Sequence, residues 1–188
     1  MEIQVDAEAK DKRLNRMVAM TVVVLSIFMG LSQVKDGNIV QAMTQAQSNA
    51  VDRWGEYQAT KTKLHIDETA KVQAHALGQA SPAAATAMAA EETRLAGEIA
   101  KYQAEIPKLR AEAEGFQTEY DALNVHDDQF DASDALIGIA VAIAAVAALV
   151  ESWPALIVAW VFGGFGMVMG MAGFLGLALR SPLATLLS

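Results

Sequence analysis

The sequence predicts an all-α integral membrane protein with three transmembrane helices and a long antiparallel coiled-coil hairpin. Three uncharged apolar runs occupy residues 17–34, 135–150 and 155–179. The first and third reach the roughly 18 residues that a bilayer requires, and the second rises about 24 Å and needs its flanking residues to cross. Between the first two runs, a heptad repeat indicates coiled-coil packing.

The N-terminal part contains a polar segment and the first span. Residues 1–16 carry four basic and four acidic side chains and are expected to form a short cytoplasmic segment. Residues 17–34 form the predicted transmembrane helix 1. The sequence KDGN follows at 35–38, and because glycine and asparagine favour turns, we expect a break or bend there.

Residues 35–134 are predicted to form an extramembrane helical hairpin. Helices are expected at about 39–78 and 82–124, since both segments are rich in Ala, Gln, Lys and Glu. Gly78 and the Ser81–Pro82 pair separate them, with Pro82 in a first turn behind a Ser81 cap. So short a connection requires the two helices to be antiparallel.

The second hairpin helix carries the most regular periodicity in the chain. Apolar residues alternate at intervals of three and four over more than five heptads, as a coiled-coil seam requires. Pro107 is expected to kink or locally open the helix. The predicted seam consists of Met88, Leu95, Ile99, Tyr102, Ile106, Leu109, Phe116, Tyr120 and Leu123.

The first hairpin helix is less regular, and its seam is predicted to drift as if the helix faced more than one neighbour. Lys71 and Gly78 stand at a heptad position that earlier turns fill with apolar residues. The other apolar surface comes from Val51, Trp54, Val72 and Leu77. The hairpin is interpreted as a structural stalk, with a docking surface as the alternative.

An acidic joint, residues 126–134, is expected to precede the second span, 135–151. Asp131, Ser133 or Asp134 can cap that helix. The alternative is a weak cation site, although the spacing does not match an EF-hand loop. Its candidate ligands are His126, Asp127, Asp128, Asp131 and Asp134.

The C-terminal part is expected to turn at Glu151–Pro154, to span the membrane over 154–180 and to end in a short tail, 181–188. The glycine-rich run GGFGMVMGMAGFLG lies within this third span. No lysine follows it as a P-loop requires, and the chain is too short beyond it for a dinucleotide fingerprint.

These glycines are therefore predicted to let helices pack closely. Whether they pack within one chain or between subunits stays open. The predicted packing residues are Gly163, Gly166, Gly170, Gly173 and Gly176 in the third span and Ala140, Ala144 and Ala148 in the second.

Composition restricts the function. The chain has no cysteine, a net charge of −8 and no HExxH motif, which argues against thiolate chemistry, nucleic-acid binding and zinc-protease activity. No catalytic residue or cofactor is predicted, and we expect no enzyme. The expected role is a homo-oligomeric scaffold or accessory subunit in the bilayer. Its copies are expected to associate through the spans and the hairpin, and its other expected partners are subunits of a membrane complex. The alternative is an oligomeric channel or transporter component.

Positive charge predicts the orientation. Lys10, Lys12, Arg13 and Arg16 precede the first span, whereas only Lys35 and Arg180 flank the spans on the opposite side. This distribution predicts a cytoplasmic N-terminus and a hairpin in the periplasm of a bacterium, with the spans in the inner membrane.

The chain resembles a known family in several stretches. These are MEIQVDAEAKDKRLNRMVAMTVVVLS, KDGNIVQAM, VDRWGEYQATKTKLH and the C-terminal pair of spans. They are similar to the bacterial membrane proteins of domain-of-unknown-function family 4337. The resemblance covers nearly the whole chain and implies bacterial origin and membrane residence, but no activity, ligand or catalytic residue.

Overall fold

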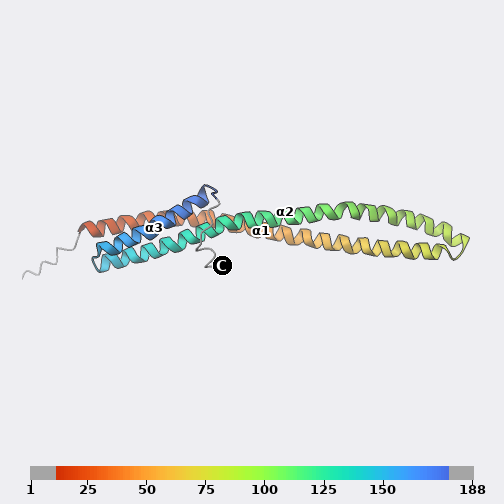
Figure 1. The fold of residues 1–188 in the computed structure, drawn as a ribbon, viewed down its shortest axis with the longest axis horizontal. Helices are drawn as coiled ribbons and strands as arrows, with labels where there is room; N and C mark the ends of the chain where they lie inside the picture. Colours follow the sequence, from red (N-terminus) through yellow and green to blue (C-terminus); the bar gives the residue numbers. More distant parts are fainter. Residues whose placement is uncertain (1–11, 178–188) are drawn as a thin grey trace, which may run out of the picture. The chain divides into compact units, whose positions relative to one another are not determined.

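The computed structural model describes residues 12–177, which form three α-helices (Figure 1). These are α1 (Lys12–Gly78), α2 (Pro82–Leu149) and α3 (Trp153–Phe174). The predicted all-α class is confirmed. Within the described residues the chain divides into a three-helix unit, made by 12–43 and 122–177, and a hairpin unit, Thr44–Asp121.

Two predicted interruptions are absent, because α1 continues through 35–38 and α2 continues through 126–134. Tertiary packing explains both results. Ile39, just after the KDGN sequence, is only 7% exposed. Phe130 is 1% exposed and packs edge-to-face against Phe174 of α3, with 5.2 Å between the ring centroids. Burial of these side chains favours helix over the local turn preference, so Asp131, Ser133 and Asp134 lie inside a helix rather than at a cap.

In the hairpin unit, α1 and α2 run antiparallel and side by side (Figure 1). The connection is tight: the Ala80 amide donates to the Leu77 carbonyl, and the Ser81 hydroxyl accepts a bond from the Ala84 amide at 3.2 Å. Pro82 is the first residue of α2. The helix also continues through Pro107, although a proline removes one backbone hydrogen bond.

The predicted seam of α2 faces inward. Leu95 and Leu109 are buried, at 2% and 7% exposure. The other predicted positions in this unit are half-buried, namely Met88, Ile99, Tyr102, Ile106, Phe116 and Tyr120. Leu123 is also half-buried and belongs to the three-helix unit. The heptad repeat therefore places these side chains between the two helices.

The predicted drift of the α1 seam was wrong. A second heptad row, at every seventh residue from Ala46, is buried at Ala46, Thr60 and Ala74 and half-buried between them. The members of this row are small or polar, so a search for a heptad repeat of apolar residues does not find it. The small members leave room for the leucines of α2. Val51, Val72 and Leu77 are instead 60–70% exposed on the surface.

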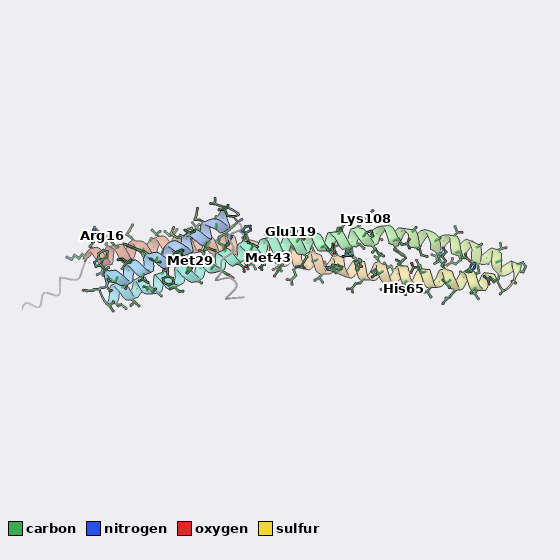
Figure 2. The ribbon with its side chains drawn as sticks, in the orientation of Figure 1. Arg16, Met29, Met43, His65, Lys108 and Glu119 are labelled. Atoms are coloured by element: carbon green, nitrogen blue, oxygen red, sulfur yellow. The ribbon has the colours of Figure 1, made fainter. Side chains whose placement is uncertain are left out.

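The three-helix unit is held together by apolar contacts between all three helices. One cluster joins Leu14 and Val18 of α1 to alanines of α2 and to Leu156 of α3. A second joins Leu25 to Ile137 and Ala140, with Met29 packed against it (Figure 2). At the end of the unit, Phe174 makes edge-to-face contacts with Phe28 and Phe130.

The ends of α3 are defined by specific caps. At its start, the Ser152 side chain accepts a hydrogen bond from the Ala155 amide. At its other end, Gly176 has a φ of 66°, and the Leu177 amide donates to the Ala172 carbonyl at 3.0 Å. A glycine suits this left-handed position. The helix therefore ends at Phe174, before the predicted end at residue 180; residues 178–188, including the predicted tail, lie outside the described range.

Candidate functional site

The glycines of α3 lie against this chain's own α1 and α2. A Cβ atom on Gly166 would lie 2.7 Å from Ile137 Cγ1 and 3.0 Å from the backbone oxygen of Ser133. One on Gly170 would lie 2.7 Å from a ring carbon of Phe28 and from Ser133 Oγ. Such distances are shorter than any carbon contact tolerates, so the close approach of these helices depends on glycine.

All of the remaining predicted packing residues except Gly176 lie in the contacts between the helices. An added Cβ on Gly163 would lie 2.9 Å from a methyl carbon of Leu25 and 3.5 Å from the Ala140 Cβ, and one on Gly173 would lie 2.8 Å from the Phe130 ring. On α2, Ala140 and Ala144 are fully buried and Ala148 is partly buried against the same core. Gly176 differs, since no atom lies within 4 Å of its added Cβ and it follows the helix end.

Four aspartates meet in the three-helix unit, and three of them are among the predicted acidic residues. Asp127, Asp131 and Asp134 follow one another along α2, and each acts electrostatically on Asp36 of α1. The carboxyl groups of Asp36 and Asp127 are hydrogen-bonded to each other. One oxygen of Asp36 and one of Asp134 are buried without a hydrogen-bond partner. Sequence reasoning missed Asp36, which stands 91 positions before its partner Asp127 in the sequence.

This environment favours the neutral form of Asp36. Desolvation is the largest cause, followed by the negative charges of Asp127 and Asp131, and together they raise the pKa of Asp36 to about 6. Burial also raises the pKa of Asp127, while its bond with Asp36 acts in the opposite direction. Below about pH 6, a proton therefore resides on Asp36, which then donates to the Asp127 carboxylate.

Three of the candidate metal ligands lie around Asp36, but the structure does not arrange the candidates as a metal site. No group of three or more His, Asp or Glu side chains among residues 12–177 has the arrangement of a metal site. His126 Nδ1 lies 3.2 Å from Gln129 Oε1, and the same Gln129 donates through Nε2 to the Leu177 carbonyl at 2.6 Å. Asp131 is exposed. Gln129, which His126 contacts, therefore joins α2 to Leu177 in the segment that follows α3.

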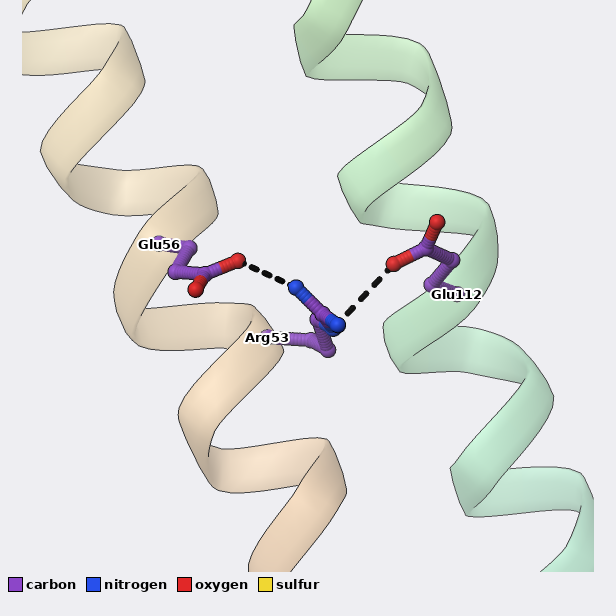
Figure 3. A network of polar contacts seen from close by, with 3 residues as sticks. All are labelled: Arg53, Glu56 and Glu112. Carbon is purple, nitrogen blue, oxygen red and sulfur yellow. Dashed lines mark hydrogen bonds and ion pairs between the residues drawn. The ribbon is translucent and has the colours of Figure 1, made fainter.

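In the hairpin unit, charged side chains link the two helices. Arg53 of α1 lies between Glu56 of its own helix and Glu112 of α2, with Nε 3.1 Å from Glu112 Oε2 (Figure 3). Nearer the hairpin turn, His75 Nδ1 of α1 lies 3.3 Å from Glu92 Oε1 of α2. Exposed pairs of this kind stabilise by less than about 1 kcal/mol, and their effect here is to favour one alignment of the helices.

An open apolar groove of about 350 Å³ lies between α1 and α3, and Met20, Val24 and Met167 contribute to its lining. Its polar atoms are already paired, because Trp160 Nε1 donates to Thr21 Oγ1 at 2.8 Å and that hydroxyl donates to the Met17 carbonyl. The groove presents no nucleophile, acid or base for catalysis.

Comparison with known proteins identifies one family. The family model described as "Domain of unknown function (DUF4337)" matches residues 14–176. No curated protein and no solved structure matches the chain. The resemblance based on the sequence stretches is thereby confirmed.

Proposed function

The chain belongs to the DUF4337 family, and we propose that it is a membrane-anchored coiled-coil protein that acts as a homo-oligomeric scaffold or accessory subunit of a membrane assembly. The observation that carries this proposal is the outward face of the three-helix unit. Each helix contains an 18-residue window apolar enough to cross a bilayer, and no more than a third of each window is buried inside the chain.

Large apolar side chains cover that outward face. Ile27 and Leu31 of α1, Val146 of α2, and Phe165 and Val168 of α3 are 52–65% exposed. Water disfavours such a surface, whereas lipid tails solvate it, and helices satisfy their own backbone groups there. The glycine contacts lie within the chain, so association of copies in the membrane would use these other faces.

The contacts of Arg13 support the proposed orientation. Its guanidinium lies 5.9 Å from the ring of Trp153, so the start of α1 and the α2–α3 turn lie at one end of the three-helix unit. Basic residues are preferred on the cytoplasmic side, and tryptophan is favoured at the membrane interface. We propose that this end faces the cytoplasm and that the aspartate cluster lies at the periplasmic end, in the inner membrane of a bacterium.

The proposed assembly is testable by mass. In mild detergent or nanodiscs, the full-length protein is expected to have a mass that is a multiple of its 20.0 kDa chain. Mass photometry or light scattering with detergent correction measures this. A monomer that purifies with no partner would exclude a scaffold, and ion flux through reconstituted liposomes would favour the alternative, an oligomeric channel.

The proposed orientation predicts the accessibility of the α1–α2 connection. A single cysteine at Gln79 is expected to react with a membrane-impermeant maleimide in intact spheroplasts, whereas one at Glu151 is expected to react only after lysis. Both positions are exposed, and the chain has no native cysteine, which makes them matched probes. Labelling of Glu151→Cys but not Gln79→Cys before lysis would reverse the topology.

A further inference from the structure

The glycine-rich run of α3 contains a glycine that the helix contacts do not explain. An added Cβ on Gly164 would meet no atom within 4 Å, whereas one on four neighbouring glycines would come within 3 Å of α1 or α2. Those four are Gly163, Gly166, Gly170 and Gly173. Gly164 is exposed and lines the open apolar groove between α1 and α3. The absence of a side chain at this position therefore keeps the groove open.

The groove has the length and the chemistry of a site for an acyl chain. Its α1 lining runs from Met17 to Leu25, about 12 Å of helix, which is close to the roughly 15 Å hydrocarbon thickness of one leaflet. Two lining residues carry polar side-chain atoms, Thr21 and Trp160, and these are hydrogen-bonded to each other. No water fills such a space inside a bilayer, and its walls lose dispersion contacts unless another group packs there. A hydrocarbon chain supplies these contacts and requires no hydrogen bond.

Basic side chains lie at the end of the unit where the groove begins. Lys12, Arg13 and Arg16 are exposed in the first turns of α1, and the α2–α3 turn at the same end adds one acidic residue, Glu151. Arg16, marked in Figure 2, forms no ion pair with any residue of the described range 12–177. It precedes Met20 of the groove by four residues, so the two side chains lie one turn apart on the same side of α1. The guanidinium is therefore available to an anion above the groove.

A second open apolar groove, of about 310 Å³, lacks this combination. Val168 and Met171 of α3 contribute to its lining. It lies toward the end of the unit that holds the aspartate cluster, since Gly170 of α3 approaches Ser133, which adjoins Asp134. Negative charge at that end repels an anionic headgroup. Of these two grooves, the first alone combines hydrocarbon walls with basic residues in the described part of the chain.

We propose that the groove between α1 and α3 binds one acyl chain of an anionic phospholipid and that Arg16 binds the phosphate of this lipid. The inference rests on the proposed membrane anchoring and orientation, which place Arg16 at the cytoplasmic leaflet, where anionic lipids attract basic residues. A guanidinium binds phosphate through two parallel N–H donors, and its long stem extends to the level of the headgroups. The chain then covers Met20 and Val24, which are 59% and 48% exposed.

Native mass spectrometry of the full-length protein tests the headgroup contact. The detergent-solubilised protein is mixed with equal amounts of phosphatidylglycerol and phosphatidylcholine that carry identical acyl chains. We expect retention of phosphatidylglycerol to exceed that of phosphatidylcholine by about fivefold or more, and Arg16→Gln to lower this ratio about fivefold, the effect of one basic residue near an anionic headgroup. The control is Lys35→Gln, exposed on α1 at the opposite end, which is expected to keep the wild-type ratio.

A second pair of variants tests the acyl-chain contact. Gly164→Leu places a side chain in the groove and is expected to lower the retention of both lipids by about tenfold, the effect of displacing about two buried CH₂ groups. Gly138→Leu is the matched control, because Gly138 is an exposed glycine of α2 whose added Cβ also meets no atom within 4 Å. Neither leucine meets an obstacle in the fold, and circular dichroism checks that helicity is retained.

The contrary outcomes are distinguishable. Equal retention of the two lipids by the wild-type protein, or a lowered ratio in Lys35→Gln but not in Arg16→Gln, would exclude the headgroup contact at Arg16. Equal lipid retention by Gly164→Leu and Gly138→Leu would exclude the groove. Extraction of membranes with alkaline carbonate tests the anchoring separately. A protein that stays in the membrane after either negative result loses only the lipid site, whereas release by carbonate would remove the proposed function as well.

Discussion

Replacing Gly166 by leucine is expected to destabilise the three-helix unit by about 3 kcal/mol or more. The first added carbon alone would lie 2.7 Å from Ile137 Cγ1, 3.0 Å from the Ser133 carbonyl oxygen and 3.2 Å from the Ile137 amide nitrogen. Two of these three atoms belong to the backbone of α2. A rotamer change therefore cannot relieve the contact, and α2 must move away from α3.

The matched control is Gly164→Leu on the same helix. Gly164 is exposed, and no heavy atom lies within 4 Å of its added Cβ, so the same side chain is expected to have little effect there. Unfolding of the detergent-solubilised full chain can be followed by fluorescence in a Trp54→Phe background, in which Trp153 and Trp160 report on this unit. Equal losses of stability in both variants would contradict glycine packing within the chain.

The sequence was sufficient to predict the elements whose stability depends on local pattern. The seam of α2 was predictable because Leu95 and Leu109 repeat with the heptad and are large enough to register as apolar. The turn at Ser81–Pro82 was predictable because proline and serine have strong positional preferences at a helix start. For both, the same residues that carry the signal also make the contact.

The missed features depend on contacts between residues far apart in the chain. Gly37 favours a break in an isolated helix, and the aspartates around Phe130 favour a cap, yet burial of Ile39 and Phe130 keeps both segments helical. The second row of the α1 seam was missed because three of its five positions, Arg53, Thr60 and Asp67, are polar. Asp36 became recognisable only when α1 and α2 were placed together, since no spacing in the sequence relates it to Asp127.

The three-helix unit is expected to lose stability as the pH rises from about 4 to about 6. The pKa of Asp36 is raised from its usual 3.8 to about 6, chiefly by desolvation and then by the charges of Asp127 and Asp131. The folded state therefore binds more protons than the unfolded state within this interval. The stabilising effect of the proton is fully present below pH 3.8 and is lost as the pH passes through 6. The pKa of Asp127 is also raised, so this group likewise makes the unit less stable as the pH rises.

Substitution of Asp36 by asparagine is expected to stabilise the unit at pH 7 and to flatten this pH dependence. The rise of the Asp36 pKa from 3.8 to about 6 corresponds to about 3 kcal/mol. Asp36 is only half-buried, however, and solvent screening reduces the expected gain to about 1 kcal/mol. The amide still donates to the Asp127 carboxylate without a second negative charge. Unfolding midpoints at pH 4 and pH 7 measure the effect, with Asp52→Asn, exposed on α1 in the hairpin unit, as the control. If Asp36→Asn retained the wild-type slope between these pH values, the proton would have to reside elsewhere in the aspartate cluster.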